Sequence, residues 1–133
     1  MRFVKIMDAK ATRGRFKMKL GTWINEKGYP RMGVGPERGK YVHILIAQAA
    51  LGRELKKDEH VHHIDGDTLN PKWTNLLVVG KDVHNAVSIR QYWYLKQKYA
   101  REDAAWRAYF DVTGETPREA WIQQNTSREL TIQ

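Results

Sequence analysis

Histidines are concentrated in one short stretch of this chain. Four of the five lie between Glu59 and His84, in the sequence EHVHHIDGDTLNPKWTNLLVVGKDVH. Within it, His62 and His63 are adjacent, Asn75 follows twelve positions after His63, and His84 follows nine positions after Asn75. A neutral imidazole can bind a metal ion or accept a proton near neutral pH. The stretch therefore offers metal binding and proton transfer side by side.

The local sequence predicts two strands and a helix that position these side chains. Val61–Ile64 suits a short strand, residues 65–67 (Asp-Gly-Asp) suit a turn, and Leu76–Val79 is an apolar, β-branched run typical of a buried strand. Asp82 is a predicted N-cap, which would place His84 in the first turn of a helix, facing the strands.

The two adjacent histidines cannot serve one site from regular strand geometry. Successive strand residues point to opposite faces, so the strand is expected to end near His62 and His63. One imidazole can then meet His84, while its neighbour stays free of metal and accepts a proton. The pattern thus predicts two ligands and one base.

This stretch resembles the ββα-metal (His-Me finger) core of the HNH endonucleases, particularly the small phage-encoded and free-standing homing type. The resemblance implies that His63 is the general base, that His62 and His84 bind a metal ion, and that Asn75 ties down the intervening loop. It extends from Trp23 to about Arg90, since a hairpin-like and a helix-like segment precede the motif as in phage members.

Two departures from the family pattern limit the expected metal content. Many members carry a further histidine four residues after the last ligand, where this chain has Ser88, and many carry cysteine pairs, where this chain has none. A second metal or a zinc knuckle is therefore not expected. The expected cofactor is one divalent ion, Mg²⁺ or Mn²⁺, with Ni²⁺ or Zn²⁺ as alternatives because imidazoles suit transition metals.

The rest of the chain indicates an α+β fold of single-domain size. A β-hairpin is expected from Leu20, followed by a helix over Tyr41–Leu51 that Gly52 ends. After His84 one helix is expected to run on to Gly114. A short last helix opens with a capping box at residues 116–119, and the final residues from Asn125 are expected to fray or dock loosely. The expected parts are a basic arm at 1–22, a nuclease core at 23–101 and a helical extension at 102–133.

Positive charge is concentrated at the N-terminus. Residues 1–40 contain eleven Lys and Arg and three Asp and Glu, so their net charge is +8 (11 − 3). The net charge of the whole chain is also +8. Such an arm suits binding to the phosphate backbone, although a solvated basic surface is the alternative. The candidate DNA-binding residues are Arg13, Arg15, Lys17, Lys19 and Arg90.

Other residues near the motif have simpler explanations. His43 on the predicted apolar helix could reach the site, but a satisfied structural role is favoured. His60 shares strand parity with His62 and is left out of the site. Asp65 and Asp67 could be outer carboxylates, but turn geometry alone explains them. An aromatic stripe after His84 is expected to pack in the core rather than stack on bases or form a subunit interface. The stripe comprises Tyr92, Leu95, Tyr99, Trp106 and Phe110.

These observations lead us to expect a metal-dependent DNA endonuclease that nicks double-stranded DNA, as a monomer or homodimer. The alternatives are a non-catalytic DNA-binding or phage DNA-packaging protein with a degenerate HNH fold, and a histidine cluster that binds structural zinc. The sequence has no run of about 18 apolar residues and no secretory signal, so no membrane association is expected. The expected location is the cytoplasm, or the host cytoplasm if the protein is phage-encoded.

Overall fold

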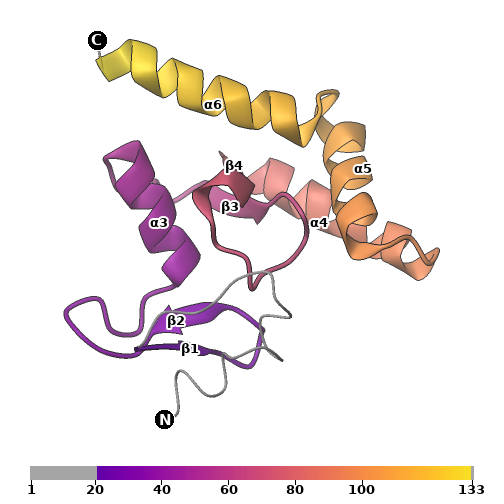
Figure 1. Cartoon of the computed structure of the whole chain (residues 1–133). Coiled ribbons are helices and arrows are strands. Elements are labelled where there is room, and N and C mark those ends of the chain that lie inside the picture. Colours follow the sequence, from indigo (N-terminus) through magenta and orange to yellow (C-terminus); the bar gives the residue numbers. More distant parts are fainter. Residues whose placement is uncertain (1–20, 133) are drawn as a thin grey trace.

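The chain folds into two small antiparallel sheets and four α-helices within the part that the structure describes (Figure 1). The computed structural model describes residues 21–132, with side chains described up to residue 126. The predicted α+β class is confirmed. The elements, in order, are β1 (Thr22–Ile24), β2 (Pro30–Met32), α3 (Val42–Leu51), β3 (Glu59–His63), η1 (Trp73–Asn75), β4 (Leu76–Gly80), α4 (Lys81–Lys96), α5 (Arg101–Thr113) and α6 (Pro117–Ile132).

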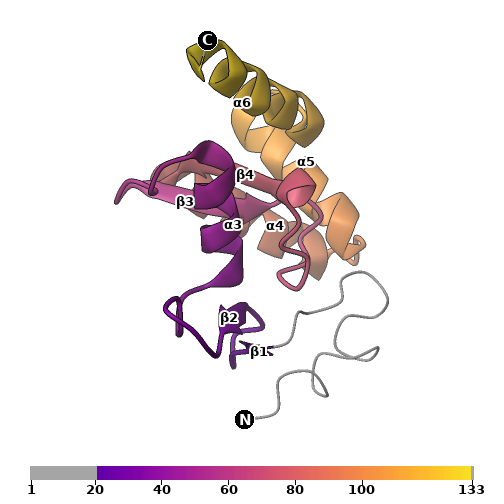
Figure 2. The same ribbon diagram turned by 60° about the vertical axis from the view of Figure 1, so that its left-hand side comes forward.

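The predicted N-terminal hairpin is present as β1 and β2, which pair antiparallel. Its turn is organised by Asn25, whose Oδ1 accepts hydrogen bonds from the backbone N–H groups of Lys27 (3.0 Å) and Tyr29 (2.9 Å). Asparagine favours turns because its short side chain can bond to the local backbone in this way. Figures 1 and 2 show the hairpin on one side of the β3–β4 sheet and α6 on the other.

The predicted apolar helix is also present as α3. It ends as expected at Gly52, which adopts a left-handed conformation (φ 73°) and donates a hydrogen bond to the Gln48 carbonyl. Glycine adopts this conformation without the steric penalty of a Cβ atom. The buried Ala47 of α3 packs against Val61 and Leu76, which places α3 on one face of the second sheet.

The predicted ββα unit consists of β3, β4 and α4. The strands pair antiparallel, with His62 opposite Leu77 and His63 opposite Leu76, and α4 follows β4 directly. The prediction that Asp82 is the N-cap is wrong, because Gly80 occupies that position without a side-chain cap. Asp82 instead lies in the first turn, where a carboxylate interacts favourably with the helix dipole.

The expectation of one continuous helix after His84 is also wrong. The chain forms two helices, α4 and α5, separated by a turn in which Lys98 adopts a positive φ of 75°. A left-handed residue cannot continue an α-helix. The two helices then pack on each other, and α5 buries Ala104, Ala105, Ala108 and Tyr109 rather than the predicted aromatic stripe.

The final helix begins with the predicted capping box. Thr116 N–H donates to Glu119 Oε1 (2.9 Å), and Glu119 N–H donates to Thr116 Oγ1 (3.1 Å). The helix is longer than the expected short helix, because the backbone is helical from Pro117 to Ile132 and so includes the residues from Asn125 that the sequence predicts to fray or dock loosely. No helix in the described range 21–132 is long and apolar enough to cross a membrane.

The helix α6 covers the open edge of β4. Gln124 Oε1 accepts a hydrogen bond from Val78 N–H (2.9 Å), and Gln124 Nε2 donates to the Leu76 carbonyl (3.3 Å). Trp121 Nε1 also donates to the carbonyl of Trp73, just before the strand (2.9 Å). An amide side chain thus bonds to the strand edge as a neighbouring strand would.

Candidate functional site

The adjacent histidines of β3, His62 and His63, contact different elements of the fold. His62 is 5% exposed, and its ring stacks on Tyr109 of α5 with centroids 5.7 Å apart. His63 is 6% exposed and lies against His43 of α3 (5.1 Å between centroids) and Tyr29 of the hairpin (5.9 Å). The strand ends at His63, as expected from the need to turn one imidazole away.

His84 lies in the first turn of α4, and its ring is 5.0 Å from that of His60. A cavity of about 400 Å³ opens at this pair and is also lined by His43. The sequence prediction left His60 out of the site and favoured a satisfied structural role for His43, and the structure places both beside the motif. The strand parity that His60 shares with His62 was the only available signal for His60.

Four of these imidazoles keep a buried ring nitrogen without a hydrogen-bond partner among the described residues. Two belong to the predicted ligands, at His62 Nε2 and His84 Nδ1. Because free nitrogens of neutral imidazoles are metal donors, these residues fit a divalent ion. No group of three or more His, Cys, Asp or Glu side chains suited to a metal exists in the part of the chain that the structure describes. The other two nitrogens are His43 Nδ1 and His63 Nε2.

Burial keeps these histidines neutral at pH 7. It lowers the pKa of His43 and of His62 to about 4, and the proximity of His84 lowers both further. Burial and the neighbouring imidazoles lower the pKa of His63 to about 3. The pKa of His84 is lowered by burial and by His60. Each ring therefore has a lone pair available for a metal ion or a proton.

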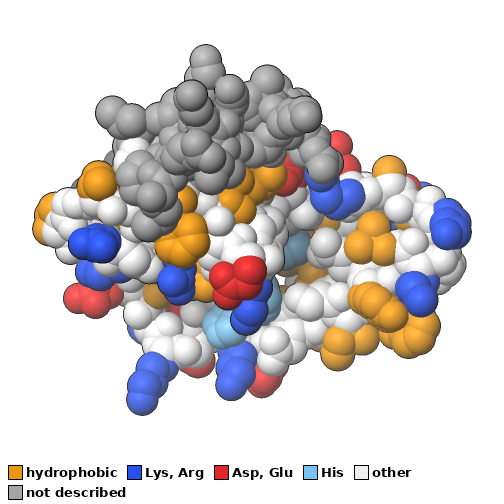
Figure 3. All heavy atoms as spheres, turned by 90° about the horizontal axis from the view of Figure 1, so that it is seen from below, with side chains coloured by type: hydrophobic (Ala, Val, Ile, Leu, Met, Phe, Trp, Pro, Cys, Tyr) orange, Lys and Arg blue, Asp and Glu red, His pale blue; other side chains and the backbone are white. Residues whose placement is uncertain are grey.

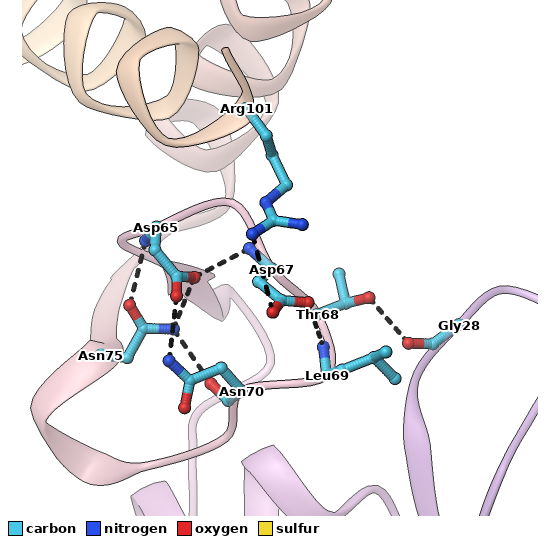
Figure 4. Close-up of polar contacts among 8 residues, drawn as sticks. All are labelled: Gly28, Asp65, Asp67, Thr68, Leu69, Asn70, Asn75 and Arg101. Atoms are coloured by element: carbon cyan, nitrogen blue, oxygen red, sulfur yellow. Dashed lines mark hydrogen bonds and ion pairs between the residues drawn. The ribbon is translucent and has the colours of Figure 1, made fainter. Parts of the chain in front are cut away.

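Asn75 closes the loop that follows His63 (Figure 4). Its side chain is 7% exposed, and its Oδ1 accepts a hydrogen bond from the backbone N–H of Asp65 (2.9 Å). Its Nδ2 donates to Asp65 Oδ1 and to the Asn70 carbonyl, both at 2.9 Å. One buried amide therefore holds both ends of the loop together immediately after the proposed base.

The two loop carboxylates are committed to the same network (Figure 4). Asp65 accepts hydrogen bonds from Asp67 N–H (2.8 Å) and from Asn70 Nδ2 (2.9 Å). Asp67 accepts from Leu69 N–H (3.1 Å) and lies 3.7 Å from the Arg101 guanidinium. These contacts support the turn explanation of the Asp-Gly-Asp sequence over a role as outer metal carboxylates.

A side-chain bond also attaches this loop to the N-terminal hairpin. Thr68 Oγ1 donates to the Gly28 carbonyl at 2.7 Å (Figure 4). The contact fixes the hairpin turn beside the motif, where Tyr29 reaches the rings of His43 and His63. Sequence reasoning missed this role of the hairpin, because a tertiary contact across forty positions leaves no local signal.

Of the predicted DNA-binding residues, only Arg90 lies in the part of the chain that the structure describes. Arg13, Arg15, Lys17 and Lys19 lie outside the described residues. Arg90 lies on α4 with its side chain 58% exposed, and its guanidinium is 3.5 Å from Asp111. An ion pair this exposed is weak, so Arg90 stays accessible to a phosphate.

The prediction that the aromatic stripe packs in the core is wrong for most of its members. Tyr92, Trp106 and Phe110 are 53%, 42% and 43% exposed, and Leu95 is also exposed. After the break at Lys98, α5 turns its alanine-rich face inward, which leaves Trp106 and Phe110 of that helix outside.

Comparison with protein families matches residues 40–86 to a model described as HNH endonuclease. The match covers α3, the β3–β4 sheet and the start of α4, so it includes the histidines of the motif and Asn75. The hairpin and the helices α5 and α6 lie outside it. Neither the curated proteins nor the solved structures contain a match to the chain.

Proposed function

We propose that the protein is a metal-dependent DNA endonuclease, because residues 40–86 match the HNH endonuclease family model. It would nick DNA by hydrolysing phosphodiester bonds with one metal ion. The family match supports nuclease activity and DNA binding, and the mechanism is our inference. One observation supports it above the others. His84 lies close enough to His62 and His63 to lower the pKa of both, and each of the three has a buried ring nitrogen without a hydrogen-bond partner among the described residues.

The proposed roles follow from this arrangement. His62 and His84 would hold one divalent ion, Mg²⁺ or Mn²⁺, with Ni²⁺ or Zn²⁺ as alternatives. When bound, the ion supplies positive charge that stabilises the charge developing on the phosphate and on the leaving 3′ oxygen. His63 would accept the proton of the attacking water, because its imidazole is neutral at pH 7 and has a ring nitrogen without a partner among the described residues.

Asn75 is proposed to act through His63 rather than on the substrate. Its three hydrogen bonds fix the loop that begins at the residue after His63. The His63 carbonyl accepts a hydrogen bond from Gly66 N–H (3.0 Å) in the turn of the same loop. A base must be held close to its productive position, because small displacements reduce the rate strongly. The network therefore supports a positioning role for Asn75.

Incubation of supercoiled plasmid with the protein and a panel of divalent ions tests the proposal. We expect nicked circles with Mg²⁺ or Mn²⁺ and intact plasmid with EDTA, and the variant His63→Ala serves as the matched control for contaminating nucleases. If correctly folded protein leaves the plasmid intact with every ion but still shifts DNA in a gel, a DNA-binding module replaces the nuclease proposal.

A further inference from the structure

The cavity beside the motif has walls from three separate parts of the chain. The hairpin contributes Lys27 and Tyr29, α3 contributes His43, and the ββα unit contributes His60 and His84. Its volume of about 400 Å³ is within the range of small-ligand sites. Lys27 and Tyr29 lie outside the family match, so the motif does not explain why they line this cavity.

His43 gives this cavity a buried polar group without a protein partner. The side chain is 7% exposed, and its Nδ1 has no hydrogen-bond partner among the described residues. Its ring is fixed by Tyr29 (5.2 Å between centroids), Tyr41 (5.4 Å) and His63 (5.1 Å). This buried nitrogen can therefore hydrogen-bond to a ligand that enters the cavity.

The charges around the cavity favour an anion. Lys27 is exposed on the hairpin turn, where its flexible side chain supplies positive charge. The acidic residue in the lining, Glu59, is engaged by Arg53 through two hydrogen bonds of 2.8 and 2.9 Å. Figure 3 shows histidine side chains on a face of the molecule where Lys and Arg side chains also project. The cavity thus combines a cation, a buried imidazole and a neutralised carboxylate.

We propose that this cavity binds a phosphate group of the nucleic-acid backbone, with the His43 imidazole donating a hydrogen bond and Lys27 supplying charge. The identification of the phosphate as part of DNA rests on the proposed function. His84 lines the same cavity, so the bound phosphate lies beside a proposed metal ligand. The hairpin and α3 then form part of the DNA site, in addition to the motif itself.

Histidine side-chain NMR tests the pocket directly. Protein labelled with ¹⁵N-histidine is titrated with inorganic phosphate in EDTA, and sodium chloride at matched ionic strength serves as the control. We expect the ring nitrogen signals of His43, assigned by their loss in His43→Gln, to shift with phosphate and not with chloride. A His43 signal that phosphate leaves unchanged would overturn the proposal. The titration itself uses the wild-type chain, and the variant serves only to assign the His43 signals.

DNA binding in EDTA provides the second measurement. By fluorescence anisotropy, His43→Phe should weaken binding to a DNA duplex, while His43→Gln, which keeps a donor, should retain most of the affinity. Lys27→Gln should reduce the slope of log affinity against log salt by about 0.9, the value for one phosphate contact. Lys57→Gln, an exposed lysine outside the cavity lining, is the matched control and should leave the slope unchanged. Equal slopes for the two lysine variants would contradict the pocket.

The two proposals fail in distinguishable ways. Metal-dependent plasmid cleavage by a protein whose His43 does not respond to phosphate would refute the pocket and leave the nuclease proposal intact. A phosphate response at His43 without cleavage under any metal would support the pocket and refute the nuclease.

Discussion

Each histidine of the chain lies against another aromatic or imidazole ring. His43 contacts His63, His60 contacts His84, and His62 stacks on Tyr109. Burial, and after it the proximity of other imidazoles, lowers the pKa of four of these side chains and so disfavours their protonation; they are His43, His62, His63 and His84. A metal ion and a proton would compete for the same ring nitrogens. Substitution of single histidines can separate a role in metal binding from a role in proton transfer.

Substitution of His63 and His84 should have different effects on metal binding. His63→Ala is expected to lower plasmid cleavage by about 10² to 10⁴, the usual contribution of a general base, and to leave the metal affinity in place. His84→Ala should lose both metal binding and cleavage. Calorimetric titration of Mn²⁺ into both variants, together with cleavage rates, measures this difference. Equal loss of metal affinity in the two variants would reject the assignment of His63 as the base.

The motif positions could be identified from sequence, but their surroundings could not. The adjacent histidines, Asn75 and His84 stand at fixed spacings along one segment, so the local pattern is visible. The approach of His43 to His63 depends instead on how α3 packs on the sheet, through Ala47 and its apolar partners. An apolar helix gives the same pattern whether its histidine meets a motif or the protein core.

At the scale of elements, α6 stabilises the motif from outside the family match. Its Gln124 bonds to both the N–H and C=O groups that β4 presents at its open edge. Without that side chain, the Val78 N–H and the Leu76 carbonyl would lose their partners in a partly buried location. Unpaired edge groups cost stability and also provide a template for pairing with another chain.

Gln124→Ala should therefore lower the free energy of unfolding by about 1–3 kcal/mol, the cost of leaving such groups unsatisfied. Gln123→Ala is the matched control, since Gln123 is exposed on the same helix and forms neither strand bond, and it should stay within about 0.5 kcal/mol. Urea unfolding followed by circular dichroism measures both values. Indistinguishable midpoints would show that α6 does not stabilise the strand edge.

The sequence predicted a helix end correctly where a terminating glycine or a capping box marks it. Gly52 ends α3 and Thr116 opens α6, both as expected from their sequence. The break between α4 and α5 has no glycine or proline, and Lys98 takes the left-handed conformation there. Packing between the two helices outweighs the local preference of lysine, so the helical period alone predicted a single longer helix.

Over the whole molecule, the β3–β4 sheet is buried on both faces. One face packs on α3 through Val61 and Leu76, and the other packs on α4, α5 and α6 around Leu77. The histidines of β3 are consequently enclosed from both sides, which explains why burial is the main cause of their lowered pKa values. The stability of the fold should therefore depend on pH.

Acid should destabilise the metal-free protein between pH 6.5 and about 4. In the unfolded chain these imidazoles take up protons near pH 6.5, whereas the pKa is about 4 for His43 and His62 and about 3 for His63 in the folded state. The unfolded state binds more protons in this window, so stability is full above pH 6.5 and falls as the pH decreases. Because a tenfold difference in proton affinity corresponds to about 1.4 kcal/mol, a loss on the order of 3 kcal/mol is expected for each of these imidazoles.

Urea unfolding in EDTA across this pH range measures the effect. His63→Gln removes one titrating group and should make the pH dependence shallower. Glu59 has a pKa lowered from 4.5 to about 2, chiefly by its hydrogen bond to Arg53. Its stabilising contribution is present above pH 4.5 and is lost as the pH falls toward 2, so it changes the stability mainly below the window of the histidines. A free energy of unfolding that stays constant from pH 7 to 4.5 would contradict the burial of neutral imidazoles.

The order of DNA products is the last prediction at this scale. The chain carries one motif, so one molecule can cut one strand in each binding event, and a concerted double-strand break would need two suitably placed copies. We therefore expect nicked circles to accumulate before linear plasmid appears. The exposed rings of Tyr92, Trp93, Trp106 and Phe110 are the described side chains through which a second copy would associate. Supercoiled plasmid that passes directly to linear product, with a dimer mass by light scattering, would contradict the prediction and assign these rings to a subunit interface.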